Sequence, residues 1–249
     1  MVLINGGKIM GKKKDIKCVS YLNGDTHLHV SNGNTKVGRG VYCVNTLAGD
    51  KPLKKKDGTQ LTNIAGTCDG CCKDCKHDCY AMKAQIRYSS MSNLKTWNDN
   101  TILAKENPKK FFEELADYLD REMVSAVRYH AMGEIPSIEY LQYMFDIAEK
   151  YKEIQFYTYT KRFKWLEEVC EKRLKPTNLV INVSIWHKNY DNPYRFPEFI
   201  YDDGTEEDVA KLPHCPAVDR NGHETGITCA QCRRCIYALL GQRTAVYAH

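Results

Sequence analysis

Apolar residues recur at helical spacing in three stretches of the chain from residue 107 onward. The first follows Asn107 and Pro108, a cap residue and a proline that suits the first position of a helix. The second follows Ser137, a residue that also caps helices, and the third starts near Phe163. Runs rich in β-branched and aromatic residues lie between these stretches and predict strands. The predicted strands cover residues 125–130, 154–160 and 179–186.

The order strand, helix, strand, helix, strand predicts parallel neighbouring strands joined by right-handed crossovers. The preceding region is rich in glycine, asparagine and lysine, which is typical of loops and short strands. We therefore expect an α/β fold in three segments. They are a β- and loop-rich N-terminal region (1–66), an α/β core (67–200) and a cysteine-rich C-terminal segment (201–249).

Ligands of parallel α/β sheets and barrels bind beyond the carboxyl ends of the strands. Polar residues gather at these ends here, although polar residues also end strands that bind nothing. We predict a binding site at this edge and expect some of these side chains to contact a substrate or cofactor. The candidates are His130, Gly133, Glu134, Thr158, Thr160, Lys161, Ser184, Trp186 and His187.

Composition places the chain among globular proteins, because 43% of its 249 residues are hydrophobic and 27% are charged. The net charge of +5 is well below the clustered basicity that would by itself indicate nucleic-acid binding. The longest apolar run, residues 179–186, is too short to span a bilayer. The first fifteen residues lack the apolar core of a signal peptide, so we expect a cytoplasmic protein without a membrane partner.

The chain has an unusually large number of cysteines, 12 in all. Five of them fall within twelve residues and form an N-terminal cysteine group. Thiols stay reduced in the cytoplasm, so metal binding explains this density better than disulfides do. Three of these cysteines could hold an iron–sulfur cluster with one iron open to a substrate or cofactor. Four of them would make an electron carrier or a structural centre, and the spacing allows both. The members are Cys68, Cys71, Cys72, Cys75 and Cys79.

A C-terminal cysteine group has the spacing C-x2-C-x2-C, with one more cysteine upstream that precedes a proline. This compact run is found in bacterial ferredoxins, and it suits a four-cornered [4Fe–4S] cluster. Zinc, which prefers paired cysteines or cysteine–histidine pairs, is the alternative, with His214 and His223 as further ligands. The members are Cys215, Cys229, Cys232 and Cys235.

Four other features have plainer interpretations. The glycine-rich residues 31–40 fail the phosphate-loop pattern, so we expect a basic surface loop, or else a loop that touches an anion or cofactor. Cys18, Cys43 and Cys170 stand apart from the two groups, and isolated thiols usually behave as small buried hydrophobes.

The ordered motifs HVSNGNTKVGRG, DCYAMKA, VRYHAMGEIPSIEYL, FYTYTKR and HCPA…TCAQCRRC resemble the gene product 88 domain family. The resemblance covers most of the chain, from Ser31 to Cys235. Proteins of this family are encoded by phages and mobile elements. The resemblance therefore implies the cytoplasm of an infected or plasmid-bearing bacterium.

A second set of residues resembles radical S-adenosylmethionine (SAM) enzymes, which place a cysteine-bound [4Fe–4S] cluster after the first strand of a partial (β/α) barrel. Carried over to this chain, the core is a partial (β/α) barrel, Cys79 is a cluster ligand, and Gly133 and Glu134 face the methionine end of SAM. The chain departs from that pattern because Tyr80 follows the last cysteine and one glycine precedes the glutamate. The C-terminal group is similar to the auxiliary clusters of several such enzymes.

Two functions follow as expectations. The first is a phage-type iron–sulfur enzyme with one or two [4Fe–4S] clusters, SAM, an external electron donor and a small-molecule or nucleic-acid substrate. The second is a cluster- or zinc-bearing protein without catalysis, which binds nucleic acid in replication or contacts a host protein. In that case coordination would contribute directly to the free energy of folding.

Overall fold

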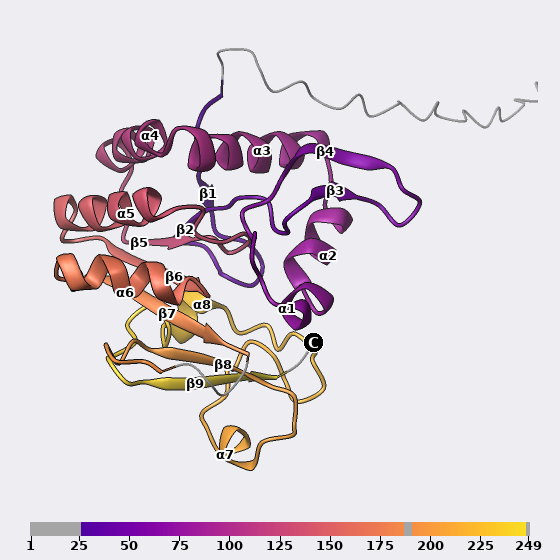
Figure 1. Ribbon diagram of the computed structural model, residues 1–249, viewed down its shortest axis with the longest axis vertical. Coiled ribbons are helices and arrows are strands. Elements are labelled where there is room, and N and C mark those ends of the chain that lie inside the picture. Colours follow the sequence, from indigo (N-terminus) through magenta and orange to yellow (C-terminus); the bar gives the residue numbers. More distant parts are fainter. Residues whose placement is uncertain (1–25, 187–190, 248–249) are drawn as a thin grey trace, which may run out of the picture.

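The computed structural model describes residues 26–186 and 191–247, which are built around one seven-stranded sheet (Figure 1). The strand order is β1-β2-β5-β6-β7-β8-β9, and a separate hairpin joins β3 to β4. Only β1 is antiparallel to its neighbour in the large sheet. The strands are β1 (Ser31–Asn32), β2 (Val41–Val44), β3 (Pro52–Lys54), β4 (Gln60–Ala65), β5 (Ala126–Tyr129), β6 (Gln155–Thr160), β7 (Leu179–Ile185), β8 (Glu198–Asp202) and β9 (Arg243–Tyr247).

Two long helices begin at the caps that the sequence predicts. The Asn107 side chain accepts a hydrogen bond from the backbone N–H of Lys110 at 3.0 Å, and the Ser137 hydroxyl accepts one from that of Tyr140 at 3.0 Å. The helices are α1 (Lys73–His77), α2 (Tyr80–Arg87), α3 (Met91–Glu106), α4 (Pro108–Arg121), α5 (Ile138–Lys150), α6 (Phe163–Lys172), α7 (Glu207–Ala210) and α8 (Cys229–Cys232).

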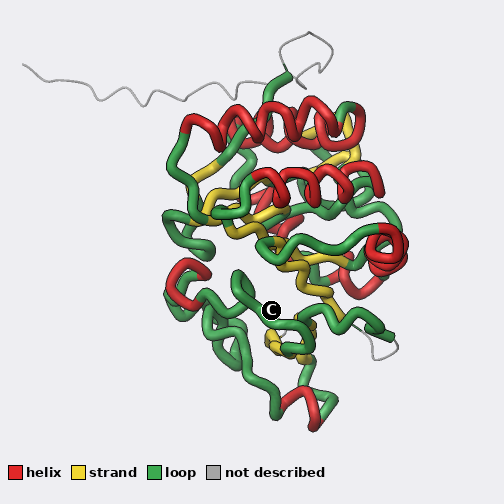
Figure 2. The backbone as a smooth tube through the Cα atoms, turned by 90° about the vertical axis from the view of Figure 1, so that its left-hand side faces the viewer, coloured by secondary structure: helices red, strands yellow, loops and turns green. Residues whose placement is uncertain are grey.

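The parallel strands follow one another in chain order, and this order determines which face the helices cover. A right-handed crossover that always steps in the same direction places each connecting helix on the same face. Figures 1 and 2 show α4, α5 and α6 as a layer on one side of the sheet. The main apolar core lies between this layer and the sheet, where Phe111, Tyr140, Phe145, Phe156 and Ile181 are fully buried.

The opposite face of the sheet is covered by the C-terminal segment and by the loop before β2. Tyr157 and Val180 pack there against Ile236 and Ala238, with Cys229 at the edge of this second apolar cluster. The C-terminal cysteine group therefore packs on the face of the sheet opposite to α4, α5 and α6.

The α/β class and the parallel strands predicted from the sequence are confirmed. The large sheet takes β1 and β2 from the N-terminal region and β9 from the C-terminal segment, so strands from all three predicted segments share one sheet. Strands β1 and β9 lie at its two ends, which leaves the sheet open over the described residues. No helix in the described part of the chain is both long and apolar enough to cross a membrane. Cys18 and His187 lie outside the described residues.

Candidate functional site

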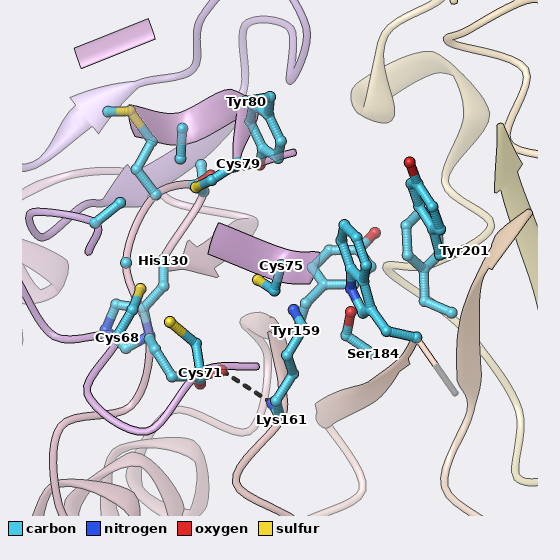
Figure 3. Close-up of a pocket in the computed structure, with 18 of the residues that line it drawn as sticks. Cys68, Cys71, Cys75, Cys79, Tyr80, His130, Tyr159, Lys161, Ser184 and Tyr201 are labelled. Atoms are coloured by element: carbon cyan, nitrogen blue, oxygen red, sulfur yellow. Dashed lines mark hydrogen bonds between the residues drawn. The ribbon is translucent and has the colours of Figure 1, made fainter. Parts of the chain in front are cut away.

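A cavity of about 220 Å³, here called the strand-end cavity, opens beyond the carboxyl ends of β5, β6 and β7. Figure 3 shows the N-terminal cysteines along one part of its wall and Ser184 and Tyr201 across from them. Thr158 does not line the cavity, because its buried hydroxyl donates to the backbone carbonyl of Tyr129 at 3.3 Å. The predicted candidates that do line it are His130, Gly133, Glu134, Lys161, Ser184 and Trp186.

Glu134 joins the end of β5 to the end of β6. Its Oε1 accepts hydrogen bonds from the backbone N–H of Ile135 and the hydroxyl of Thr160, both at 2.8 Å. Its Oε2 accepts one from the backbone N–H of Lys161 at 2.9 Å. A carboxylate has about four acceptor positions. Glu134 thus fixes the rim of the cavity and keeps about one position for a ligand.

Gly133 sits where no larger residue fits. Its φ of +93° lies in the region that favours glycine, and a Cβ atom there would stand 1.9 Å from Oγ1 of Thr46 and 2.8 Å from Oγ1 of Thr67. The hydroxyl of Thr67 in turn accepts from the backbone N–H of Glu134 at 2.7 Å. The turn after β5 is therefore pressed directly against the loop that leads into the N-terminal cysteine group.

His130 is a buried, strained residue at the end of β5. Its φ of 55° lies in the left-handed region that residues other than glycine seldom adopt, and such conformations are concentrated at functional sites. Nε2 lies 3.1 Å from the hydroxyl of Tyr140, while Nδ1 has no partner among the described residues. Burial, with a smaller contribution from nearby Arg128, lowers the pKa of His130 to about 3. The ring is therefore neutral at pH 7.

Four of the five N-terminal cysteines line the strand-end cavity, namely Cys68, Cys71, Cys75 and Cys79. Cys72 instead caps α1, where its sulfur accepts from the backbone N–H of Cys75 at 3.4 Å. Burial raises the pKa of Cys68 to about 12, so this thiol is protonated at pH 7 unless a metal binds it.

Arg162 fixes the start of the cysteine loop. Its Nη2 donates to the backbone carbonyl of Thr67 at 3.0 Å and to the Asp69 carboxylate at 2.6 Å. Its Nε donates to the carbonyl of Ile135 at 3.1 Å. One side chain at the start of α6 therefore holds both the cysteine loop and the turn after β5.

The four C-terminal cysteines line a smaller cavity of about 30 Å³, here called the C-terminal cysteine cavity. Two of them, Cys215 and Cys229, also line the strand-end cavity, so the two cavities share a wall. Burial raises the pKa of Cys235 to about 12. The two cysteine groups, far apart in the sequence, therefore both contribute to the wall of one cavity.

The glycine-rich loop of residues 31–40 carries the C-terminal group. The backbone N–H of Cys229 donates to the carbonyl of Lys36 at 3.1 Å, and that of Ala230 to the carbonyl of Val37 at 2.9 Å. A Cβ on Gly38 would lie 2.7 Å from Oγ1 of Thr228, so this glycine allows the close approach. The loop therefore docks α8, and Lys36 lines the strand-end cavity.

Asn182 is a buried residue of β7. Its side-chain amide donates a hydrogen bond to the backbone carbonyl of Cys235 at 3.1 Å. His214 has both ring nitrogens engaged. Nε2 lies 2.7 Å from the Asp202 carboxylate and Nδ1 lies 2.8 Å from the carbonyl of Leu212. The exposed His223 lies beside Asp219. Neither histidine is directed toward the four C-terminal thiols in this arrangement.

Both cysteine groups offer thiols, which are ligands of the kind that hold metal–sulfur centres. All described cysteines are free thiols, and over residues 26–186 and 191–247 no three acidic, histidine or cysteine side chains converge on a single metal ion. Two buried donors next to the C-terminal group, Nε of Arg128 and the hydroxyl of Tyr157, have no partner among the described residues. Sulfur atoms of a cluster accept hydrogen bonds, and such bonds tune its reduction potential.

Aromatic side chains form another part of the wall of the strand-end cavity. The rings of Trp186 and Tyr201 stack with centroids 4.1 Å apart, and the ammonium of Lys161 lies 5.5 Å from the Trp186 centroid. The Tyr201 hydroxyl donates to Asp78 at 3.4 Å, which joins β8 to the loop between α1 and α2.

Sequence reasoning did not identify Arg128, Arg162 or Tyr201 as site residues. Arg128 carried one signal, since it is a charged residue between Val127 and Tyr129 in the middle of a predicted strand. Arg162 and Tyr201 carried none, because their roles depend on contacts between segments far apart in the chain.

The fold and the site define a cysteine-rich α/β protein. Its N-terminal and C-terminal cysteine groups both border a cavity at the carboxyl ends of parallel strands. Residues 28–238 match the family described as Gene product 88, and the chain belongs to this family. No curated protein and no solved structure matches the chain.

Proposed function

We propose that this protein is an iron–sulfur enzyme with two metal centres, one at each cysteine group, that acts on a ligand in the strand-end cavity. The observation that carries the proposal is the shared cavity, whose wall contains Cys68, Cys71, Cys75 and Cys79 together with Cys215 and Cys229. A structural metal site needs no such opening, whereas a catalytic one keeps a position open to its ligand.

The N-terminal centre would be held by the four cysteines that line the cavity, or by three of them with one iron open to a ligand. The C-terminal centre would be held by Cys215, Cys229, Cys232 and Cys235, which all line one small cavity. The engaged nitrogens of His214 favour a cluster of four thiolates there over a cysteine–histidine zinc site. When bound, such clusters supply one-electron transfer beside the ligand.

The residues of the chain itself would bind and orient the ligand. Glu134 offers its remaining acceptor position to an ammonium group, and the glycine at 133 leaves the backbone close to the cavity. Lys161 supplies positive charge, and Trp186 supplies an apolar face. An amino acid moiety joined to an aromatic ring, which is the chemistry of SAM, matches this set of groups.

The proposal of a radical-SAM type of enzyme also draws support from the topology. The strands β2, β5, β6, β7, β8 and β9 follow one another in order and in parallel, as in a partial (β/α) barrel. The cysteine loop precedes β5, and Gly133-Glu134 follows it, as the resemblance implies.

The test is a single-turnover assay on full-length, anaerobically purified protein. Protein reduced with dithionite is expected to convert SAM to 5′-deoxyadenosine and methionine, and Cys79→Ala is expected to abolish this conversion. Cys170→Ala is the matched control, because Cys170 is a half-buried thiol that lines neither cavity. Absence of both SAM binding and SAM cleavage in a protein that contains its clusters would reject the enzyme.

A further inference from the structure

Arg128 is a buried cation without a carboxylate partner in the described part of the chain. It lies on β5, in the middle of the sheet, and is 8% exposed. The ionisable side chains near it are those of Tyr157, Tyr80, Tyr159 and Cys229, and none of them is a carboxylate. An arginine stays charged in proteins, so this charge has been moved out of water without an ordinary ion pair.

The contacts of the Arg128 guanidinium point to one place. Nη1 lies 4.0 Å from the sulfur of Cys229, and the guanidinium carbon lies 5.0 Å from the ring centroid of Tyr159 and 5.9 Å from that of Tyr157. The Nε atom has no hydrogen-bond partner among the described residues. Contacts with the aromatic rings offset only part of the cost of burying the charge. We therefore expect an anion beside Cys229 to compensate the charge of the guanidinium.

A second orphaned donor lies next to the same sulfur atoms. The buried hydroxyl of Tyr157 has no partner in the described residues, and Tyr157 lines the C-terminal cysteine cavity with all four thiols. Two buried donors without acceptors are costly unless an acceptor is present in the working protein. A metal centre held by thiolates provides that acceptor and carries the negative charge, because its metal core only partly neutralises its ligands.

We propose that Arg128 is the fixed counter-charge of the metal centre at the C-terminal cysteine group, a positioning residue that raises the reduction potential of that centre. The proposal rests on the proposed function, because it requires a redox-active centre at those cysteines. Arg128 stabilises the reduced form more than the oxidised form, since reduction adds one negative charge beside a fixed positive one. Arg128 also lines the strand-end cavity, so it lies between the C-terminal centre and the ligand.

The experiment compares two substitutions of Arg128 in the full chain, purified without oxygen. Arg128→Met removes the charge and keeps much of the side-chain volume, whereas Arg128→Lys keeps the charge. Arg234→Met is the matched control, because Arg234 also lines the C-terminal cysteine cavity but is exposed, so water screens its charge. The readouts are iron and acid-labile sulfide content and a redox titration of both centres followed by electron paramagnetic resonance.

In Arg128→Met, the reduction equilibrium of one centre is expected to become less favourable by about tenfold, which is 59 mV for a one-electron couple. The reduction potential of the other centre in Arg128→Met should stay near the parent value. Both potentials in Arg128→Lys and in Arg234→Met should also stay near the parent values. Loss of one centre's iron in Arg128→Met but not in Arg128→Lys also supports the proposal, because lysine keeps the positive charge and methionine does not.

Unchanged potentials in an Arg128→Met protein that keeps both centres would overturn the proposal, and would assign the charge to an anionic ligand of the strand-end cavity. Loss of iron from both Arg128 variants would also overturn it, since packing alone would then explain the residue. A parent protein without iron and sulfide is a different result, because it rejects the proposed function itself.

Discussion

The guanidinium of Arg162 lies 2.6 Å from the carboxylate of Asp69, and this contact joins the start of α6 to the loop of the N-terminal cysteine group. The same side chain donates to the carbonyls of Thr67 and Ile135. These two backbone contacts matter more than the ion pair, because the Asp69 side chain is 71% exposed whereas that of Arg162 is 14% exposed.

We therefore expect Arg162→Ala to lower the free energy of unfolding by about 2–4 kcal/mol, since charged donors to backbone carbonyls are lost. Asp69→Asn should cost less than about 1 kcal/mol. Chemical denaturation of both variants measures the difference, and iron analysis should show the larger loss in Arg162→Ala. Equal effects of the two substitutions would mean that the exposed ion pair, and not the carbonyl contacts, holds the loop.

Substitutions of Gly133 and Gly40 distinguish the cost of steric overlap from the cost of an unfavourable φ. Gly133→Ala should destabilise the protein by about 3 kcal/mol, because a Cβ there meets Oγ1 of Thr46 at 1.9 Å in addition to the unfavourable φ. Gly40→Ala is the matched control. It has a similar φ of +86° with nothing within 4 Å, so it should cost about 1 kcal/mol. Thermal unfolding of both variants checks this, and similar midpoints would show that the turn after β5 is not tightly packed.

Burial of His130 predicts a pH dependence of stability. Its pKa is about 3 in the folded protein and 6.5 in the unfolded chain, so below pH 6.5 the unfolded chain binds a proton that the folded one does not. The free energy of unfolding should therefore fall by about 2 kcal/mol between pH 7 and pH 5 because of this residue.

His130→Asn removes the titrating ring and keeps a side chain that tolerates a positive φ. The difference in stability between the parent and this variant should change by that amount across the same pH range, as measured by urea denaturation. A difference that is independent of pH would mean that the imidazole of His130 is accessible to protons in the folded state.

The two neighbouring cysteines at positions 72 and 75 have different roles. Cys75 lines the strand-end cavity, whereas the sulfur of Cys72 caps α1. Cys75→Ser should lower the iron content of the N-terminal centre severely, while Cys72→Ser should leave it nearly intact, because serine also caps helices. Iron and sulfide analysis of the two proteins is the measurement, and the reverse order would exchange their assignments.

The parts of the fold that local pattern encodes could be predicted from the sequence. Asn107 and Ser137 cap their helices, and the polar ends of β5, β6 and β7 meet at one cavity. These features depend on periodicity and on the geometry of parallel strands, which operate within about thirty residues of chain.

Helix α3 could not be predicted in this way, because half of its buried residues are polar. Asn100 donates to the carbonyls of His29 and Asn45, and the Thr101 hydroxyl accepts from the backbone N–H of Leu47. The polar side chains of such a helix satisfy the backbone of neighbouring loops, and they interrupt its apolar stripe. The docking of α8 on the loop before β2 was equally hidden, since it rests on backbone hydrogen bonds.

The most direct measurement of the central claim is the iron and acid-labile sulfide content of full-length protein purified without oxygen. Two [4Fe–4S] centres predict about eight iron and eight sulfide per chain. Substitution of Cys229 and Cys232 by serine should halve both values and leave the N-terminal centre in place. Stoichiometric zinc without sulfide, or a chain that binds neither metal nor sulfide, would contradict the account.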